Sequence, residues 1–175
     1  AGAANLELYQ VNSNVCYPSG HSSTGMWVDY PDANNACHLL LCFSNIVGSG
    51  LGQIPSNAIV VSAELMLYIS DTGDGTPLFR MLRSWNAATD TWNSLGAGIQ
   101  TNDVEARSIF DSQLGSYDGP NTGTGAVSTG VTSDVQAWVN GQTNYGWAMV
   151  GWTTNANGTA FIPSQSTNLT ARPRL

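Results

Sequence analysis

Aromatic side chains are the residues of this chain best suited to recognition chemistry. The chain has six tryptophans and six tyrosines. Exposed aromatic faces stack on sugar rings, although the same side chains also fill cores. If residues 147–152 form a strand, Trp147 and Trp152 point to opposite faces, so one of them faces outward. Other aromatic residues lie in or near turn-rich segments, and they are further candidates for a carbohydrate-binding platform: Trp27, Tyr30, Tyr117 and Tyr145.

Calcium is the cofactor that the acidic turns suggest. The sequence D-T-G-D-G begins at Asp71 and offers the carboxylates of Asp71 and Asp74 together with turn carbonyls. Calcium prefers such oxygen ligands, although the full EF-hand loop is absent. Asp-Gly turns also connect hairpins without any metal, so both interpretations stay open. A weaker pair of the same kind is Asp29 and Asp32, on either side of Pro31.

Catalytic patterns are scarce. The two histidines, His21 and His38, have no partner at recognisable spacing, and the sequence contains no G-x-S-x-G turn. A glycosidase needs two carboxylates across a cleft. The twelve acidic residues lie mostly in turns, where nothing in the sequence would raise a pKa. The sequence therefore predicts that the chain is not an enzyme.

The three cysteines form an odd set, which leaves at least one thiol free or paired with another chain. Cys37 and Cys42 would point to opposite faces of one strand and lie roughly 16 Å apart, too far for a bridge. A disulfide between Cys16 and Cys37 is therefore expected, with Cys42 as a buried free thiol. The C-x4-C spacing argues against zinc, because zinc sites normally use closer pairs.

Short alternating segments separated by turns predict an all-β fold. Between Ser62 and Ser70, apolar and other residues alternate with a period of two, and the flanking segments have turn chemistry. Eight or nine such segments indicate a jelly-roll-like antiparallel β-sandwich in a single domain, residues 1–175. The expected strands are 5–11, 26–29, 37–44, 60–70, 77–84, 126–131, 147–153 and 159–163, with a stub at 172–175.

One short helix is expected after residue 131. Ser133 and Gln136 form an S-x-x-Q capping box, and apolar residues repeat at helical spacing before Gly141. The helix should lie across one end of the sandwich and bury Trp138. A weaker helical turn is expected at residues 103–110, with Asn102 as N-cap.

Several segments in order resemble a known family. They are IPSNAIVVSAELMLY from Ile54, R-S-W ending at Trp85, T-W ending at Trp92, LLLCF from Leu39, DVQAWVNG from Asp134, N-Y-G-W ending at Trp147 and the terminal RPRL. Together they are similar to the extracellular DNRLRE, or disaggregatase-related, domains, a group that includes carbohydrate-binding module family 96. The resemblance covers nearly the whole chain.

The resemblance implies a jelly-roll-like sandwich without catalysis, carried on bacterial and archaeal surface proteins, with polysaccharide binding in some members. It places Trp85, Trp92 and Trp138 in the core. It also makes Trp147 the inward residue of its pair, which leaves Trp152 as the outward platform candidate.

Composition limits the partners. The net charge is -7, lysine is absent and five arginines are the only strong cations. Nucleic acid and anionic membranes need basic patches, so neither is expected as a partner. No run approaches the roughly 18 apolar residues of a membrane span. The start at Ala1 and the end at Leu175 suggest a matured product or a fragment of a longer chain.

Two functions follow as expectations. The first is a non-catalytic module, extracellular or on a cell or virion surface, that binds polysaccharide or acts in adhesion. The second is a structural subunit of a surface filament, sheath or virion, whose partners are copies of the chain or neighbouring surface proteins. Strand-like segments near both ends, ANLELYQV and RPRL, suit the second, because terminal strands often complete a neighbour's sheet.

Overall fold

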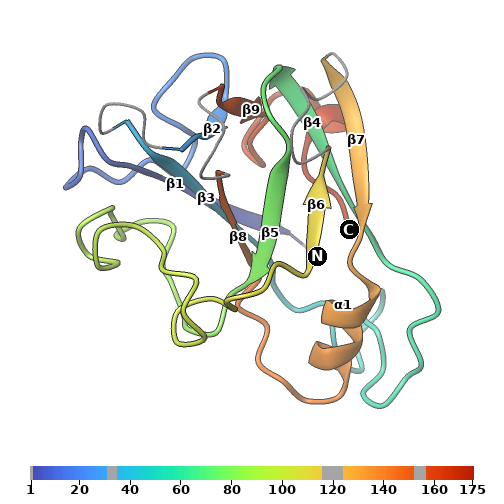
Figure 1. Cartoon of the computed structure of the whole chain (residues 1–175). Helices are drawn as coiled ribbons and strands as arrows, with labels where there is room; N and C mark the ends of the chain where they lie inside the picture. The colour runs from blue at the N-terminus through green and yellow to red at the C-terminus, as the bar shows by residue number, and fades with distance from the viewer. Residues whose placement is uncertain (1, 31–34, 116–123, 152–156) are drawn as a thin grey trace.

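Nine β-strands form two antiparallel sheets in the described part of this computed structural model (Figure 1). The structure describes residues 2–30, 35–115, 124–151 and 157–175. The elements are β1 (Ala3–Tyr9), β2 (Met26–Val28), β3 (Cys37–Phe43), β4 (Glu64–Asp71), β5 (Thr76–Arg80), β6 (Ser112–Leu114), β7 (Gly125–Gly130), α1 (Thr132–Val139), β8 (Trp147–Val150), β9 (Thr159–Phe161) and the short 3-10 turn Leu169–Ala171.

The strand order is that of a jelly roll with one added strand. One sheet runs β2-β9-β4-β7, and the other runs β1-β3-β8-β5-β6. From β2 to β5, successive strands alternate between the two sheets, so the two sheets are wound together as in jelly rolls. β1 extends the second sheet by pairing with β3. The predicted all-β, jelly-roll-like sandwich with one short helix is therefore confirmed.

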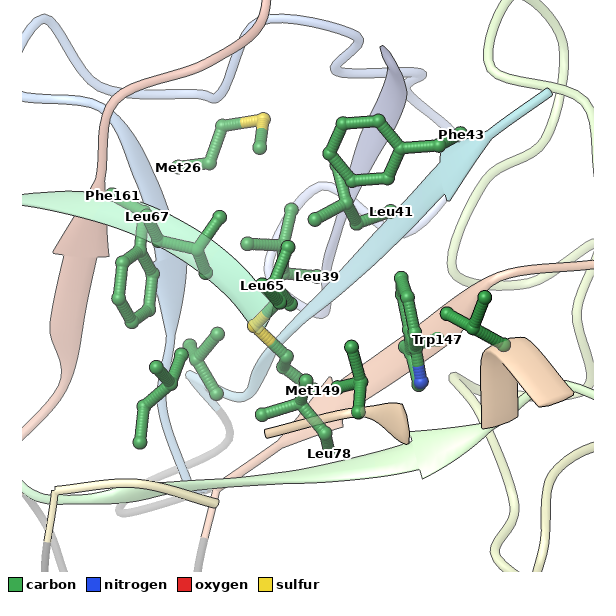
Figure 2. Packing of buried hydrophobic residues seen from close by; sticks show 14 of the residues in the cluster. Met26, Leu39, Leu41, Phe43, Leu65, Leu67, Leu78, Trp147, Met149 and Phe161 are labelled. Atoms are coloured by element: carbon green, nitrogen blue, oxygen red, sulfur yellow. The ribbon is translucent and has the colours of Figure 1, made fainter. Parts of the chain in front are cut away.

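The main core lies between the sheets and follows from strand alternation. Leu39, Leu41 and Phe43 of β3 face Leu65 and Leu67 of β4 in Figure 2, and all five are at most 3% exposed. Shortening one of these leucines to alanine typically costs 2–5 kcal/mol. The packing of this layer holds the two sheets together face to face.

Helix α1 closes one end of this core. The rings of Trp138 and Trp147 lie 4.8 Å apart between centroids, and both residues are buried as expected. The Trp147 indole N–H donates to Asp134 Oδ2 at 2.7 Å. The helix ends with a pair of bonds, Gly141 N to Trp138 O and Gln142 N to Ala137 O, which is a Schellman motif.

The predicted capping box is wrong. Helix α1 begins after Val131, which makes no side-chain cap bond, so Ser133 lies inside the first turn. Gln136 instead donates to Ala58 O and accepts from Val60 N at 3.0 and 2.8 Å. Its amide holds the segment before β4 and is therefore unavailable to the helix N-terminus.

A second hydrophobic cluster covers the outer face of the five-stranded sheet. Leu6 and Leu8 of β1 and Leu40 of β3 pack there against the segment from residue 81 to residue 106. This segment is the long yellow-green excursion in Figure 1. His38 stacks obliquely on Trp92, and its Nδ1 accepts from Ile99 N at 3.0 Å. Trp92 is buried as expected, whereas Trp85 is half-buried.

Other boundaries differ from the expectations. β6 was not predicted, because its residues Ser112, Gln113 and Leu114 carry no apolar alternation. Residues 103–110 contain no helical turn. Asn102 Oδ1 does accept from the backbone of Val104 and Glu105, but the chain then bends away instead of winding on. The stub at 172–175 is reduced to a bridge between Arg174 and Met66.

His38 should make the fold sensitive to acid. Burial lowers its pKa from 6.5 to about 4, so between these values the unfolded chain binds more protons than the folded one. The stability that depends on a neutral His38 is fully present above pH 6.5 and is lost as pH falls toward 4. His38→Asn keeps an acceptor for Ile99 N–H without titrating. We expect it to remove roughly 2 kcal/mol of acid destabilisation, measured by urea unfolding at pH 7 and pH 4.5. Identical pH dependence in both proteins would contradict this role.

Asp134 should act with the opposite sign. Burial raises its pKa from 3.8 to about 6, and Asp111 adds to the rise, whereas the Trp147 bond and Arg80 oppose it. The folded chain therefore holds this proton longer than the unfolded one, and stability falls as pH rises from 3.8 to 6. Asp134→Asn still accepts from Trp147. The free energy of unfolding of Asp134→Asn, relative to that of the original chain, should rise by on the order of 1 kcal/mol between pH 4 and pH 7 in the same assay. A constant difference across this range would refute the assignment.

Candidate functional site

The inner face of β1 is polar, whereas the inner faces of β3 and β4 are apolar. Alternation directs Leu6 and Leu8 to the outer cluster, so Asn5, Glu7 and Tyr9 point to the other side. Asn5 and Glu7 are nevertheless fully buried. Buried polar groups are stable only when hydrogen-bonded. The loops that cover β1 must therefore supply their partners.

Asn5 binds two separate loops. Its Nδ2 donates to Pro18 O at 2.6 Å, and its Oδ1 accepts from Ser164 N at 2.8 Å. These bonds attach the segment after β1 and the segment after β9 to the edge strand. They fix the position of the loop that carries His21.

Glu7 is the buried acid of the site. Its Oε2 accepts from Trp27 N at 2.6 Å, and its Oε1 contacts the Nδ1 of His21. Burial raises the pKa of Glu7, whereas the bond from Trp27 and the contact with His21 oppose that rise. The carboxyl group therefore joins β1, β2 and the loop before β2 at one point.

His21 lies over this carboxyl group with aromatic residues around it. Its ring stacks on that of Tyr9 with centroids 4.0 Å apart and an interplanar angle of 15°. Tyr17 meets both rings edge-on, at 6.0 Å from His21 and 6.2 Å from Tyr9. The stack fixes the orientation of the imidazole.

A cavity of ≈ 180 Å³ opens beside this stack. The Nε1 of Trp27 is buried and has no hydrogen-bond partner among the described residues. A polar ligand in the cavity would meet the carboxylate of Asp29 and the amide of Asn35 next to aromatic rings. The lining residues are Tyr9, His21, Trp27, Asp29, Asn35 and Cys37.

Cys37 provides a buried thiol in the cavity wall. Its Sγ lies 3.6 Å from Asn35 O. Burial raises the pKa of Cys37, and the nearby charges of Glu7 and Asp29 add to the rise. Nucleophilic cysteines need surroundings that lower the pKa. Cys37 is therefore protonated at neutral pH and unsuited to attack a substrate.

The predicted disulfide is not formed, because Cys16, Cys37 and Cys42 are all free thiols. Cys16 packs beside the outer cluster, and its Sγ donates to Ala87 O at 3.1 Å. Cys37 has the strand parity of Leu39 and so points to the inner face. The two thiols lie on opposite sides of the sheet. Cys42, expected to be buried, is half-buried beside Asn144.

The predicted aromatic platform is only partly brought together. Trp27 lines the cavity, and Tyr30 follows it as a half-buried residue. Tyr145 lies in another hollow, of ≈ 170 Å³, beside Trp85, whose indole N–H donates to Tyr145 O at 2.8 Å. Trp152 and Tyr117 lie outside the described residues. Tyr9, Tyr17 and His21 were missed, although the alternation of polar residues in β1 was a usable signal for Tyr9.

The predicted calcium ligands do not belong to a cluster in the described structure. Asp71 ends β4 with an exposed side chain. Asp74 joins two loops: its Oδ2 accepts from Asn157 N at 3.2 Å, and its backbone carbonyl accepts from Thr159 Oγ1 at 2.7 Å. Among described residues, the one group of three metal-ligating side chains is Glu7, His21 and Cys37. Asp32 lies outside the described residues.

Comparison with known proteins adds no relative. No protein-family model matches the chain, and no curated protein is significantly similar to it. The resemblance to DNRLRE domains thus rests on the quoted segments alone. Within the described residues, no helix is long and apolar enough to cross a membrane.

Proposed function

We propose that the chain is a non-catalytic β-sandwich module that binds a saccharide at the cavity beside His21. It acts outside the cell, or on the surface of a cell or virion, in recognition or adhesion. The observation that carries the proposal is the convergence of the rings of Tyr9, His21 and Trp27 with the polar side chains of Asp29 and Asn35 on one cavity. Rings that stack and polar groups that fix orientation are the usual components of small-ligand sites.

The size of the cavity limits the ligand. Sites for drug-sized molecules occupy about 300–1,000 Å³, whereas this cavity measures ≈ 180 Å³. It suits one terminal sugar or the substituents of one ring. Further rings of a polysaccharide would lie over the exposed His21 and the half-buried Tyr17.

Charge favours neutral sugars. Asp29 lines the cavity and Glu7 lies behind it, whereas no arginine is among the described residues that line it. Arg80 and Arg83 are near Asp134 and Glu105 instead. Uronic acids and sulfated sugars would be repelled by these carboxylates without a compensating cation. Neutral polysaccharides are therefore the proposed class.

Affinity electrophoresis against neutral and acidic polysaccharides tests the proposal. A neutral polymer should retard the chain, and Trp27→Ala should weaken binding about tenfold, which corresponds to loss of about 1.4 kcal/mol. Tyr68→Ala is the matched control, because Tyr68 is an exposed ring on β4. Circular dichroism checks that each variant folds. Absence of retardation by every polymer, or equal retardation of Trp27→Ala and the original chain, would refute saccharide binding at this cavity.

A structural role is the second candidate, and the segment before β4 favours it. Residues 58–63 form no strand, yet Val60 and Ala63 pack on the core while Ile59 and Val61 are 87% and 91% exposed. Exposed apolar side chains on a segment outside both sheets are suited to contact with another copy of the chain.

Sedimentation velocity tests self-association. If this segment joins copies, the sedimentation coefficient should rise with concentration, and Val61→Lys should keep the chain monomeric, because a charge opposes pairing at an edge. Leu169→Lys, at a residue outside this segment that is 67% exposed, serves as control. A monomer at all concentrations would argue against the structural role.

A further inference from the structure

Three different metal-binding side chains meet at the wall of the cavity and directly behind it. The carboxylate of Glu7, the imidazole of His21 and the thiol of Cys37 each offer a ligand atom, and these atoms all lie within 4.8 Å of one another. Glu7 comes from β1, Cys37 from β3, and His21 from the loop before β2. The pairing of Tyr9 with Cys37, the attachment of the loop through Asn5 and the bond from Glu7 N to Tyr17 O bring them together.

The spacing suits one tetrahedral ion. Zinc binds sulfur at about 2.3 Å and nitrogen or oxygen at about 2.0–2.2 Å, which places ligand atoms roughly 3.3–3.7 Å apart around the metal. The ligand atoms lie within 4.8 Å of one another, so side-chain rotations that move these atoms by about 1 Å bring them to the zinc spacing. The contact between His21 Nδ1 and Glu7 Oε1 already joins two of the three ligands without the backbone moving.

The charge also favours a cation. Glu7 is fully buried, and Asp29 lines the same cavity. Burying a carboxylate without a full positive charge is costly. The chain has no lysine, and no arginine lines the cavity in the part of the chain that the structure describes. A divalent ion would carry more positive charge than an imidazole in either protonation state, so it would offset the buried negative charge more completely.

Neighbouring groups already hold the three ligands. The backbone N–H of Trp27 donates to Oε2 of Glu7, the ring of Tyr9 stacks against that of His21, and pairing within the sheet fixes the backbone of Cys37 in β3. Such supporting contacts orient ligands around metals in proteins. With three protein ligands, one coordination position is left toward the cavity, as in open zinc sites.

We propose that Glu7, His21 and Cys37 bind one divalent transition metal of the zinc class. A thiolate and an imidazole select such ions over calcium and magnesium, which prefer oxygen ligands. The site is separate from Asp71 and Asp74, where calcium was expected. The proposal stands without saccharide binding, because every ligand belongs to the chain.

The test is a titration of the full chain after chelator treatment, with zinc and with calcium in separate isothermal calorimetry runs. One zinc ion should bind per chain, and calcium should bind at least a hundredfold more weakly. His21→Gln and Cys37→Ser should each reduce zinc affinity at least tenfold. The half-buried thiol variant Cys42→Ser is the matched control and should bind as the original chain does.

Cobalt provides a readout that reports on the ligands themselves. Bound cobalt should show tetrahedral visible bands and a thiolate charge-transfer band, and the latter should vanish in Cys37→Ser but persist in Cys42→Ser. His21→Gln keeps the test valid if Cys37→Ser fails to fold, because the His21 side chain is 24% exposed.

Three results would overturn the proposal: no zinc binding, zinc affinity unchanged in both ligand variants, or equal loss in Cys42→Ser. None of these titrations contains a saccharide. Failure of the metal site is therefore distinguishable from failure of saccharide binding.

Discussion

Strand β3 is buried on both faces, and much of the remaining structure follows from covering them. Leu39 and Leu41 face the other sheet, whereas His38 and Leu40 face the opposite way. One sandwich can bury only one face of each sheet, so the outer face needs a cover of its own. The segment from residue 81 to residue 106 provides it. The cost is a histidine enclosed in apolar surroundings, where it stays neutral.

The same constraint explains why polar chemistry gathers at β1. This strand lies at the edge of the five-stranded sheet, and loops around Pro18 and Ser164 bind its inner residue Asn5. Loop backbones bring N–H and C=O groups that need partners. Asn5 and Glu7 meet that need better than leucines would. The buried acid and the cavity thus lie at the edge of the five-stranded sheet, where loops instead of the other sheet cover its inner face.

The sequence predicted the strands and the helix, because these follow from the periodicity of apolar residues. It did not predict where side chains in loops point, because that depends on the path of the loop. The alternation in β4 and the apolar run LLLCF in β3 sufficed for the core, and helical spacing sufficed for Trp138. The disulfide failed because Cys16 lies in a loop whose path brings it to the outer cluster. The capping box failed because Gln136 had a better partner in Val60, far away in the chain. The site itself was hidden, because Glu7, His21 and Cys37 are 14 and 16 residues apart and form no motif.

The charge of the cavity ties the two proposals together. Without metal, Glu7 and Asp29 give it a formal charge of about minus two when ionised, because burial keeps the Cys37 thiol protonated. A bound dication would displace the thiol proton, so the added thiolate offsets half of the metal's charge. The cavity then keeps a charge of about minus one. The net charge of the cavity therefore stays negative when the metal is bound, while the open coordination position would give a sugar oxygen an additional contact.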